Sequence, residues 1–151
     1  MQQGHDYAPV MAPTKPVCEP GEFVIAAAFA DHGHLFGMVS NLLAAGATLG
    51  YVYEPDEAKA NKLLALDPAA KRVDSFDAIL QAPDVRLVAA AAIPNLRAGV
   101  GIRVLQADKD YFTDKCPFTS LEQLEAVRQV VLATSRKYAV CFSERVQNEA
   151  A

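Results

Sequence analysis

The chain has 151 residues, enough for one domain with a sizeable core, and its 52% apolar and 21% charged residues are typical of a globular protein. A formal net charge of −4 gives no general attraction to nucleic acid or anionic membranes, and no apolar run approaches the roughly 20 residues that cross a bilayer. The first twenty residues lack the features of a signal peptide, and the three cysteines form no C-x-x-C pair. We therefore expect free thiols and a cytoplasmic protein.

The N-terminal segment, residues 1–21, is rich in proline and shows little apolar periodicity. Proline removes backbone donors and fixes φ, so we predict an extended or mobile arm. The alternative is an arm that lies across a sheet edge or a partner subunit. We expect the remaining residues, 22–151, to form one domain.

From residue 22 onward, strand-like and helix-like segments alternate. Short apolar runs predict strands at residues 22–29, 47–54, 71–74, 85–93, 109–115 and 137–143. Helical spacing predicts helices at residues 33–45, 55–66, 76–81, 96–107 and from 119 onward. The alternation predicts an α/β fold, a doubly wound and mostly parallel six-stranded Rossmann sheet with helices on both faces. The expected strand order is 3-2-1-4-5-6, with the ligand crevice between the first and fourth strands.

Two local signals set helix ends. Gly46 is predicted to stop the first helix, because glycine accepts the left-handed conformation beyond a helix end. Thr119 and Glu122 have the spacing of a capping box, which is predicted to open the last helix. The residues expected to share one face of that helix are Leu121, Leu124, Val127 and Val131.

The first strand-to-helix turn, FADHGHLFG (residues 29–37), stands where a dinucleotide-binding domain usually carries G-x-G-x-x-G. Gly33 and the amides of the first helical turn could hold a phosphate, with His32 or His34 as additional donors. The alternative without a ligand is that Asp31 caps the helix. No metal site is predicted from Asp31 and the two histidines, because an H-x-H pair with one acid is common by chance and no fourth ligand is evident.

Three segments resemble one protein family: NLLAAGATLGYVYEPDEAKA (residues 41–60), AAIPNLRAGVGIRVLQADKDYFTDK (91–115) and FTSLEQLEAV (118–127). In this order and spacing they are similar to the N-terminal domain of the glucose–fructose oxidoreductase and inositol dehydrogenase family. The similarity extends over about residues 22–148. Members of that family are NAD(P)-dependent oxidoreductases that act on sugars, polyols and related compounds.

The resemblance also implies a missing partner domain. The family pairs its Rossmann domain with a C-terminal α/β domain that supplies much of the substrate pocket, and this sequence ends at Ala151, where that domain would begin. We therefore expect at most weak dinucleotide binding and no complete hydride transfer by this chain alone. The alternatives are a non-catalytic interaction or assembly module that has lost dinucleotide binding, and the N-terminal fragment of a complete oxidoreductase.

Two sites of the resemblance concern cofactor binding. Glu54 ends the second strand, where the family places an acid that accepts hydrogen bonds from the adenosine ribose and favours NAD over NADP. The alternative for Glu54 is an exposed helix-capping carboxylate. The family's three glycine positions fall on Phe29, Asp31 and His34, whose side chains would hinder the approach of the pyrophosphate.

TDKCPFTS (residues 113–120) resembles the family's E-K-P motif. Lys115 falls on the lysine near the nicotinamide and substrate, so it is the expected catalytic residue and also a cofactor contact. Asp114 replaces the glutamate conservatively. Cys116 replaces the proline, and because Pro117 comes one place late, the shift could swing the lysine away. The alternative for Lys115 is a solvated residue at a strand end.

AAIPN (residues 91–95) resembles the loop that flanks the nicotinamide. Pro94 would end the fourth strand, and Ile93 and Asn95 would face the cofactor. The alternative is an ordinary strand-to-helix turn with Asn95 as the N-cap, and both interpretations can hold together.

The last predicted strand is expected to lie at a sheet edge. Residues 138–142 are apolar, and an uncovered edge offers unpaired amides and carbonyls to another chain, so we expect a homo-oligomer, most simply a dimer. The segment SERVQN (residues 143–148) resembles the family's exit from this strand, where Glu144 and Arg145 would lie near the site or form a surface ion pair.

Overall fold

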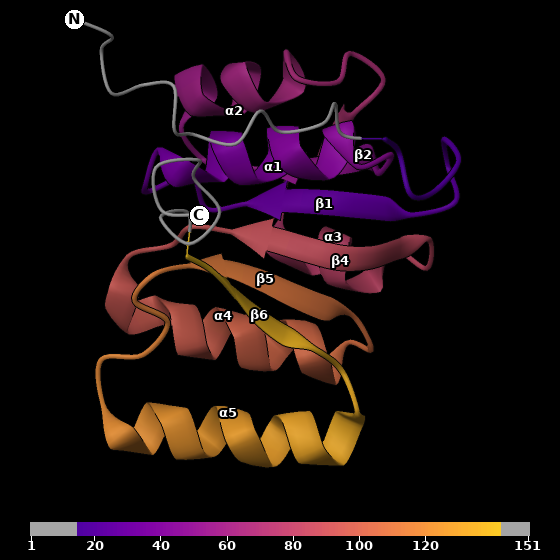
Figure 1. Ribbon diagram of the computed structural model, residues 1–151. Coiled ribbons are helices and arrows are strands. Elements are labelled where there is room, and N and C mark those ends of the chain that lie inside the picture. Colours follow the sequence, from indigo (N-terminus) through magenta and orange to yellow (C-terminus); the bar gives the residue numbers. More distant parts are fainter. Residues whose placement is uncertain (1–14, 143–151) are drawn as a thin grey trace, which may run out of the picture.

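The computed structural model describes residues 15–142, which form one parallel sheet with helices on both faces (Figure 1). The strands run in the order β3-β2-β1-β4-β5-β6, and every pairing is parallel. Their bounds are β1 (Val24–Ala28), β2 (Thr48–Tyr53), β3 (Lys71–Arg72), β4 (Val85–Ala90), β5 (Asp110–Asp114) and β6 (Tyr138–Cys141). The predicted fold class and strand order are confirmed.

The central strand β1 has no polar face because helices cover both of its sides. Ile25 and Ala27 belong to the core cluster on one side, and Ala26 and Ala28 belong to the cluster on the other. All four side chains are fully buried. A continuous apolar run is therefore required here, rather than the alternating pattern of a half-exposed strand.

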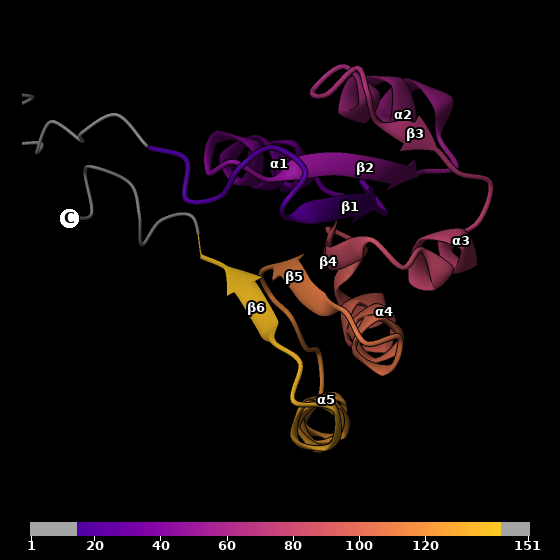
Figure 2. The ribbon, with the colours of Figure 1, turned by 90° about the vertical axis from the view of Figure 1, so that its right-hand side faces the viewer.

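The helices divide between the two faces (Figure 2). One face carries α1 (His34–Ala44) and α2 (Glu57–Leu64). The opposite face carries α3 (Phe76–Gln81), α4 (Pro94–Gln106) and α5 (Leu121–Thr134). No helix of the described chain combines the length and apolar character that a membrane span requires.

The start of α5 differs from the prediction by one residue. Ser120 is the N-cap, and its hydroxyl accepts a hydrogen bond from the Gln123 amide at 3.3 Å. The Gln123 side chain in turn accepts the Thr119 amide at 2.8 Å. The first half of a capping box is present at Ser120 and Gln123 rather than at Thr119 and Glu122. The return bond goes to the amide of Thr119, the residue before the N-cap, instead of the amide of Ser120.

The predicted apolar face of α5 is only partly buried. Val127 is buried and Val131 is half-buried, whereas Leu121 and Leu124 are exposed. The four residues lie on one helix, as predicted, but their shared face is not buried along its whole length, because α5 packs alongside α4, outside the sheet (Figure 2). Gly101 on α4 faces β5 and β6, where an added Cβ would lie 2.7 Å from the Tyr111 ring, so a side chain would not fit without displacement.

The described part of the N-terminal arm packs at the amino end of the sheet. The Val17 amide donates to the Ala45 carbonyl at 2.8 Å, and the Gly21 amide donates to the Thr48 hydroxyl at 2.8 Å. Gly46 follows the end of α1 with a φ of +104°, the left-handed region that the helix-stop prediction required. A hollow between residues 16–22 and this turn lies at the opposite end of the strands from the predicted site.

Candidate functional site

The turns that follow β1, β2, β4 and β5 lie at one edge of the sheet, because parallel strands all end on the same side (Figure 1). The order of the strands reverses between β1 and β4, which makes this edge the usual ligand crevice of the fold. All of the cofactor and catalytic residues predicted from the sequence lie on these turns or at the start of the helices that follow them.

The first residue of the β1–α1 turn keeps a glycine-like backbone without being glycine. Phe29 has a φ of +57°, in the left-handed region that glycine favours. Its ring packs 5.4 Å from the ring of Tyr53 and 4.9 Å from the ring of Phe76, measured between centroids. The side chain is thus held in the core on the α3 side of the sheet.

The N-cap residue of α1 has no side chain to cap the helix, and the His34 amide donates instead to Nδ1 of His32 at 3.4 Å. Gly33 is the N-cap residue and Asp31 is exposed, so the prediction that Asp31 caps this helix is wrong. A Cβ added to Gly33 or Gly37 would meet no atom within 4 Å. The start of α1 therefore has open space beside both glycines. The amides of His34, Leu35 and Phe36 already donate within the turn, so an anion such as a phosphate would have to compete with these bonds.

Glu54 is buried, and its side chain hydrogen-bonds to the turn after β1 and to the turn after β2. Its side chain accepts the Ala30 amide at 2.6 Å through Oε2 and the Asp56 amide at 3.0 Å through Oε1, and the residue is 5% exposed. Asp56, not Glu54, caps α2 by accepting the Lys59 amide at 3.0 Å. The alternative that Glu54 is an exposed helix cap is wrong.

A small pocket lies beside Glu54, at the end where the adenosine ribose binds in folds of this kind. It is lined by Tyr53, Glu54, Pro55, Arg72, Val73 and Asp74. The Arg72 guanidinium donates to the backbone carbonyl of Glu54 at 3.2 Å. The exposed charged groups of the pocket are the Arg72 guanidinium and the Asp74 carboxylate, while the Glu54 carboxylate is buried and bonded to backbone amides.

Asp114, the last residue of β5, is the buried acid on the other side of the crevice. Its side chain is 2% exposed, and its oxygens lie 3.1 Å from Nδ1 of His32 and 3.0 Å from Nδ1 of His34. Burial alone would raise the pKa of Asp114. Hydrogen bonds from His34 and from the Lys115 amide, together with the charges of His34 and Arg97, outweigh burial and hold the pKa below its usual value.

Arg97 holds the turns after β4 and β5 together from a buried position. Its Nε donates to the Ala92 carbonyl at 2.6 Å, and Nη1 donates to the backbone carbonyls of Lys115 and Cys116. Its Nη2 lies 3.4 Å from an Asp114 oxygen. This one side chain therefore fixes the backbone that carries Lys115.

Arg97 was not among the site residues predicted from the sequence, although its helical spacing indicates a buried position. Arg97 falls on the same helical face as Gly101, Val104 and Leu105, at spacings of four, seven and eight residues, and all of these positions are buried. An arginine on the apolar face of a helix must be paired where it is buried. That requirement could have pointed to an acid at the neighbouring strand end.

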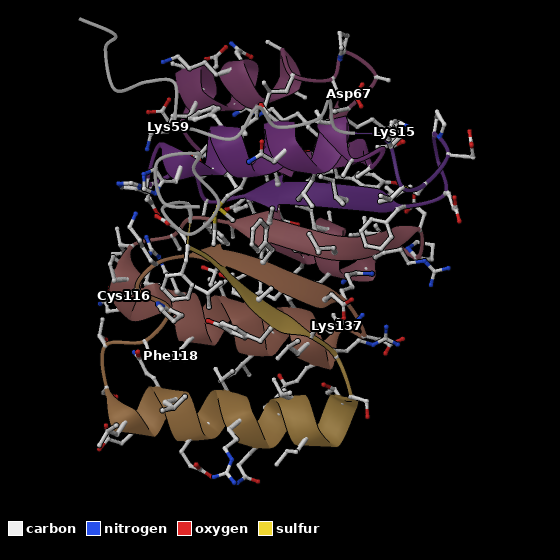
Figure 3. The ribbon with its side chains drawn as sticks, viewed as in Figure 1. Lys15, Lys59, Asp67, Cys116, Phe118 and Lys137 are labelled. Atoms are coloured by element: carbon white, nitrogen blue, oxygen red, sulfur yellow. The ribbon has the colours of Figure 1, made fainter. Side chains whose placement is uncertain are left out.

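Lys115 lies at the mouth of the crevice. Its Nζ is 3.3 Å from Nδ1 of His34, which joins two predicted site residues that are 81 positions apart in the sequence. Cys116 and Phe118 follow on the loop between β5 and α5 (Figure 3). The predicted contacts of residues 143–148 lie outside the described residues.

The β4–α4 turn also lies at this edge. Ile93 is the N-cap of α4, Pro94 is its first residue and Asn95 is the second, so the prediction that Asn95 caps this helix is wrong. Ile93 and Asn95 are both exposed, and the Asn95 carbonyl accepts the Gln123 side chain at 3.0 Å. Pro94 is suited to this first helical position because its missing amide donor is not needed there.

Comparison with known proteins agrees with this architecture. The sequence model of the "Oxidoreductase family, NAD-binding Rossmann fold" matches residues 25–142. No curated protein sequence matches the chain. Among solved structures, a protein assigned as an oxidoreductase from Erwinia carotovora atroseptica SCRI1043 is 40% identical, with a TM-score of 0.78 over 82% of this chain and 37% of that chain.

Two further solved structures share the fold at lower identity. Myo-inositol dehydrogenase from Lactobacillus casei, in complex with NAD(H) and myo-inositol, is 22% identical with a TM-score of 0.72, over 83% of this chain and 38% of that chain. A protein assigned as an NADPH-dependent oxidoreductase from Desulfitobacterium hafniense is 20% identical with a TM-score of 0.73, over 85% and 36% of the two chains. The chain spans little more than a third of the length of these relatives. On the family match, the chain belongs to the NAD-binding Rossmann-fold oxidoreductase family, that of glucose–fructose oxidoreductase and inositol dehydrogenase.

Proposed function

We propose that this chain binds NAD(H) in the crevice between β1 and β4, as the dinucleotide-binding part of an oxidoreductase acting on sugars or polyols. The observation that carries the proposal is the 3.3 Å approach of Lys115 Nζ to Nδ1 of His34. It brings the lysine of the E-K-P-like motif to the first turn of α1, where dinucleotide phosphates bind in this fold. The dehydrogenase from L. casei, with its NAD(H) and myo-inositol, supports the choice of ligand class.

The residues of this chain have separate roles in the proposal. The amide of Gly33 and the side chains of His32 and His34 bind the pyrophosphate, and Ile93 and Asn95 flank the nicotinamide. The bound cofactor supplies hydride acceptance or donation. The Lys115 ammonium donates a hydrogen bond to the reacting oxygen of the substrate and assists its proton transfer.

Substrate turnover requires more than the residues described here. The matched relatives are nearly three times as long as the part that this chain covers, so the substrate pocket is expected to need a second domain, a partner chain or a second copy. We therefore propose dinucleotide binding by the isolated chain, without complete hydride transfer.

The choice between NAD and NADP depends on the pocket beside Glu54. The proposal favours NAD(H), because the Glu54 carboxylate lies at the end of β2 and would repel a 2′-phosphate. Arg72 lines the same pocket, and a guanidinium there favours the 2′-phosphate of NADP instead. Titration with both dinucleotides separates these contributions.

The test is a fluorescence titration of the full chain with NADH and with NADPH. We expect a dissociation constant for NADH in the high micromolar range, because the three glycine positions carry side chains, and weaker binding of NADPH. Asp31→Asn should tighten NADH binding severalfold, since a carboxylate beside a diphosphate repels it. The matched control is Asp108→Asn at the amino end of the sheet, which should leave the affinity for NADH unchanged. Absence of binding in the wild type and in Asp31→Asn would reject the proposal.

A second candidate function is a non-catalytic assembly module. The specific observation in its favour is that both oxygens of Glu54 are already used by backbone amides, while Phe142, beside the β6 edge, is 54% exposed. This candidate predicts a homodimer without dinucleotide affinity. Light scattering at tens of micromolar tests it, and a mass of 16.2 kDa together with measurable NADH binding would reject it.

A further inference from the structure

Three potential metal ligands converge at the mouth of the crevice: His32, His34 and Asp114. Each offers one ligand atom, and these atoms all lie within 4.8 Å of one another. Asp114 is buried, whereas the side chains of His32 and His34 are 52% and 40% exposed, so the cluster opens to solvent on one side. We propose that these three residues bind a divalent transition-metal ion of the zinc class.

Hydrogen bonding alone does not satisfy this arrangement. Nδ1 of His34 lies 3.0 Å from an Asp114 oxygen and 3.3 Å from the Lys115 ammonium. An imidazole nitrogen has one in-plane direction for a proton or a lone pair, so it cannot donate to the carboxylate and accept from the ammonium at the same time. A divalent ion removes the conflict, because it accepts lone pairs from His34 and Asp114 together and displaces the ammonium.

The distances suit first-row metals. Zinc lies about 2.0–2.2 Å from imidazole nitrogens and carboxylate oxygens, which places neighbouring ligands in a tetrahedral site about 3.3 Å apart. Nδ1 of His32 lies 3.1 Å from Oδ2 of Asp114 and Nδ1 of His34 lies 3.0 Å from Oδ1, so the two histidines approach different oxygens. One ligand atom from each residue can be chosen within 4.8 Å of the other two, and side-chain rotation must close that spacing to about 3.3 Å. The two imidazoles favour zinc, nickel or copper over calcium and magnesium, which prefer oxygen ligands.

The charges around the cluster set its expected affinity. Arg97 lies 3.4 Å from one Asp114 oxygen, and metal binding must displace the Lys115 ammonium. Both cations oppose the ion, so we expect weaker binding than at a closed four-ligand structural site. Three protein ligands leave a coordination position for water or for a ligand oxygen.

From the sequence, Asp31 was the acid considered with the two histidines, and no metal site was predicted. Asp31 neighbours the two histidines in the sequence, but the cluster is completed by Asp114, which is 80 positions from His34. Asp31 is exposed and is not part of the cluster. The site was therefore hidden until the end of β5 was placed beside the β1–α1 turn.

The test is calorimetric titration of the full, metal-stripped chain with Zn²⁺ alone, in the absence of any dinucleotide. We expect one equivalent to bind, with an affinity lowered at least about tenfold by His32→Gln or by His34→Gln. The matched control is His5→Gln, the same substitution at the one remaining histidine of the sequence, which should leave the affinity for Zn²⁺ unchanged. Far-ultraviolet circular dichroism establishes that each variant is folded.

Cysteine thiolates are the competing explanation for any binding that is observed. The spectrum of the Co²⁺ complex distinguishes them, since thiolate ligands add intense charge-transfer bands that nitrogen and oxygen ligands lack. We expect no such bands, and unchanged Zn²⁺ affinity after replacing the three cysteines with serine. The proposal is overturned if the wild type does not bind, if His32→Gln/His34→Gln binds as tightly as the wild type, or if binding disappears with the cysteines. None of these outcomes depends on whether NADH binds.

Discussion

Two buried carboxylates flank the crevice, and their surroundings differ. Glu54, at the end of β2, is satisfied by the backbone amides of Ala30 and Asp56. Asp114, at the end of β5, is approached mainly by side chains, those of Arg97 and the two histidines, with one backbone amide from Lys115. We call these surroundings the Glu54 corner and the Asp114 corner.

The two corners differ in whether the carboxylate is bonded mainly by the backbone or mainly by side chains. A buried carboxylate must be hydrogen-bonded, and both corners meet that requirement. Backbone amides are fixed by the fold, so the Glu54 corner can change only if two turns move. The side chains of the histidines and of Lys115 can rotate or exchange partners, so the Asp114 corner can respond to a ligand without unfolding. We therefore expect ligand chemistry at the Asp114 corner.

The largest expected effect comes from removing the buried cation of the Asp114 corner. Arg97→Met leaves the Asp114 charge and the backbone carbonyl of Ala92 without their buried donor. Breaking a buried ion pair from one side costs about 3 to 5 kcal/mol, and we expect a loss of that size in urea unfolding. Arg97→Met/Asp114→Asn should recover part of the loss, and Arg128→Met on the exposed side of α5 is the control. A loss below about 1 kcal/mol would show that Arg97 is not the main partner of Asp114.

The two corners also differ in how far the sequence could predict them. Glu54 was predicted from its place at the end of a strand together with the family resemblance, and Lys115 from the resemblance of residues 113–120 to the family's E-K-P motif. The pairing of Asp114 with the histidines was not predictable, because it joins side chains 80 positions apart and depends on rotamers and on the register of β4 with β5. Element types were predicted well since long apolar runs and helical spacing are local features.

Helix starts were predicted less well than the elements themselves. Asp31 and Asn95 are residue types that favour N-caps, but the observed N-caps of α1 and α4 are Gly33 and Ile93, neither of which has a side-chain hydrogen bond. At these two turns the backbone conformation is determined by the crevice that the turns line. The cap preference of individual residues is too small, about 1 kcal/mol, to override it.

The next effect tests the Glu54 corner. Glu54→Gln keeps the size of the side chain but places an amide NH₂ against one of the two backbone N–H groups, so one charge-assisted bond is replaced by a clash of donors. We expect about 2 kcal/mol lower stability in urea unfolding. Glu57→Gln, on the exposed first turn of α2, is the matched control. An unchanged free energy of unfolding would mean that Glu54 is free to serve a ligand, which would place ligand chemistry in both corners.

The strands leading to the two corners each carry a tyrosine, Tyr51 on β2 and Tyr111 on β5. Burial raises the pKa of Tyr111 from 10.0 to about 12. The unfolded chain therefore loses this proton first, and the stability that depends on the neutral phenol is present below pH 10 and is lost as the pH rises through 12. Between pH 9 and pH 11 the wild type should lose about 1.4 kcal/mol more than Tyr111→Phe.

The control for this alkaline loss is Tyr51→Phe, since Tyr51 is much less buried and should follow the wild type more closely. The measurement is urea unfolding at the two pH values. Equal losses in the wild type and in Tyr111→Phe would show that the strand behind the Asp114 corner opens to water before the chain unfolds.

The smallest expected effect is that of replacing His32, and it tests most directly whether the Glu54 corner and the Asp114 corner differ. The His32 side chain is 52% exposed, and Asp114 keeps Arg97 and the Lys115 amide as partners when this imidazole is removed. In the presence of a chelator, His32→Gln should therefore change the free energy of unfolding by less than about 0.5 kcal/mol, the range of ordinary surface substitutions. A loss of about 2 kcal/mol or more would make the imidazole a structural partner like the amides around Glu54. A ligand that displaces the imidazole would then lower the stability of the fold, as it would at the Glu54 corner. The proposal that only the Asp114 corner binds a ligand would be rejected.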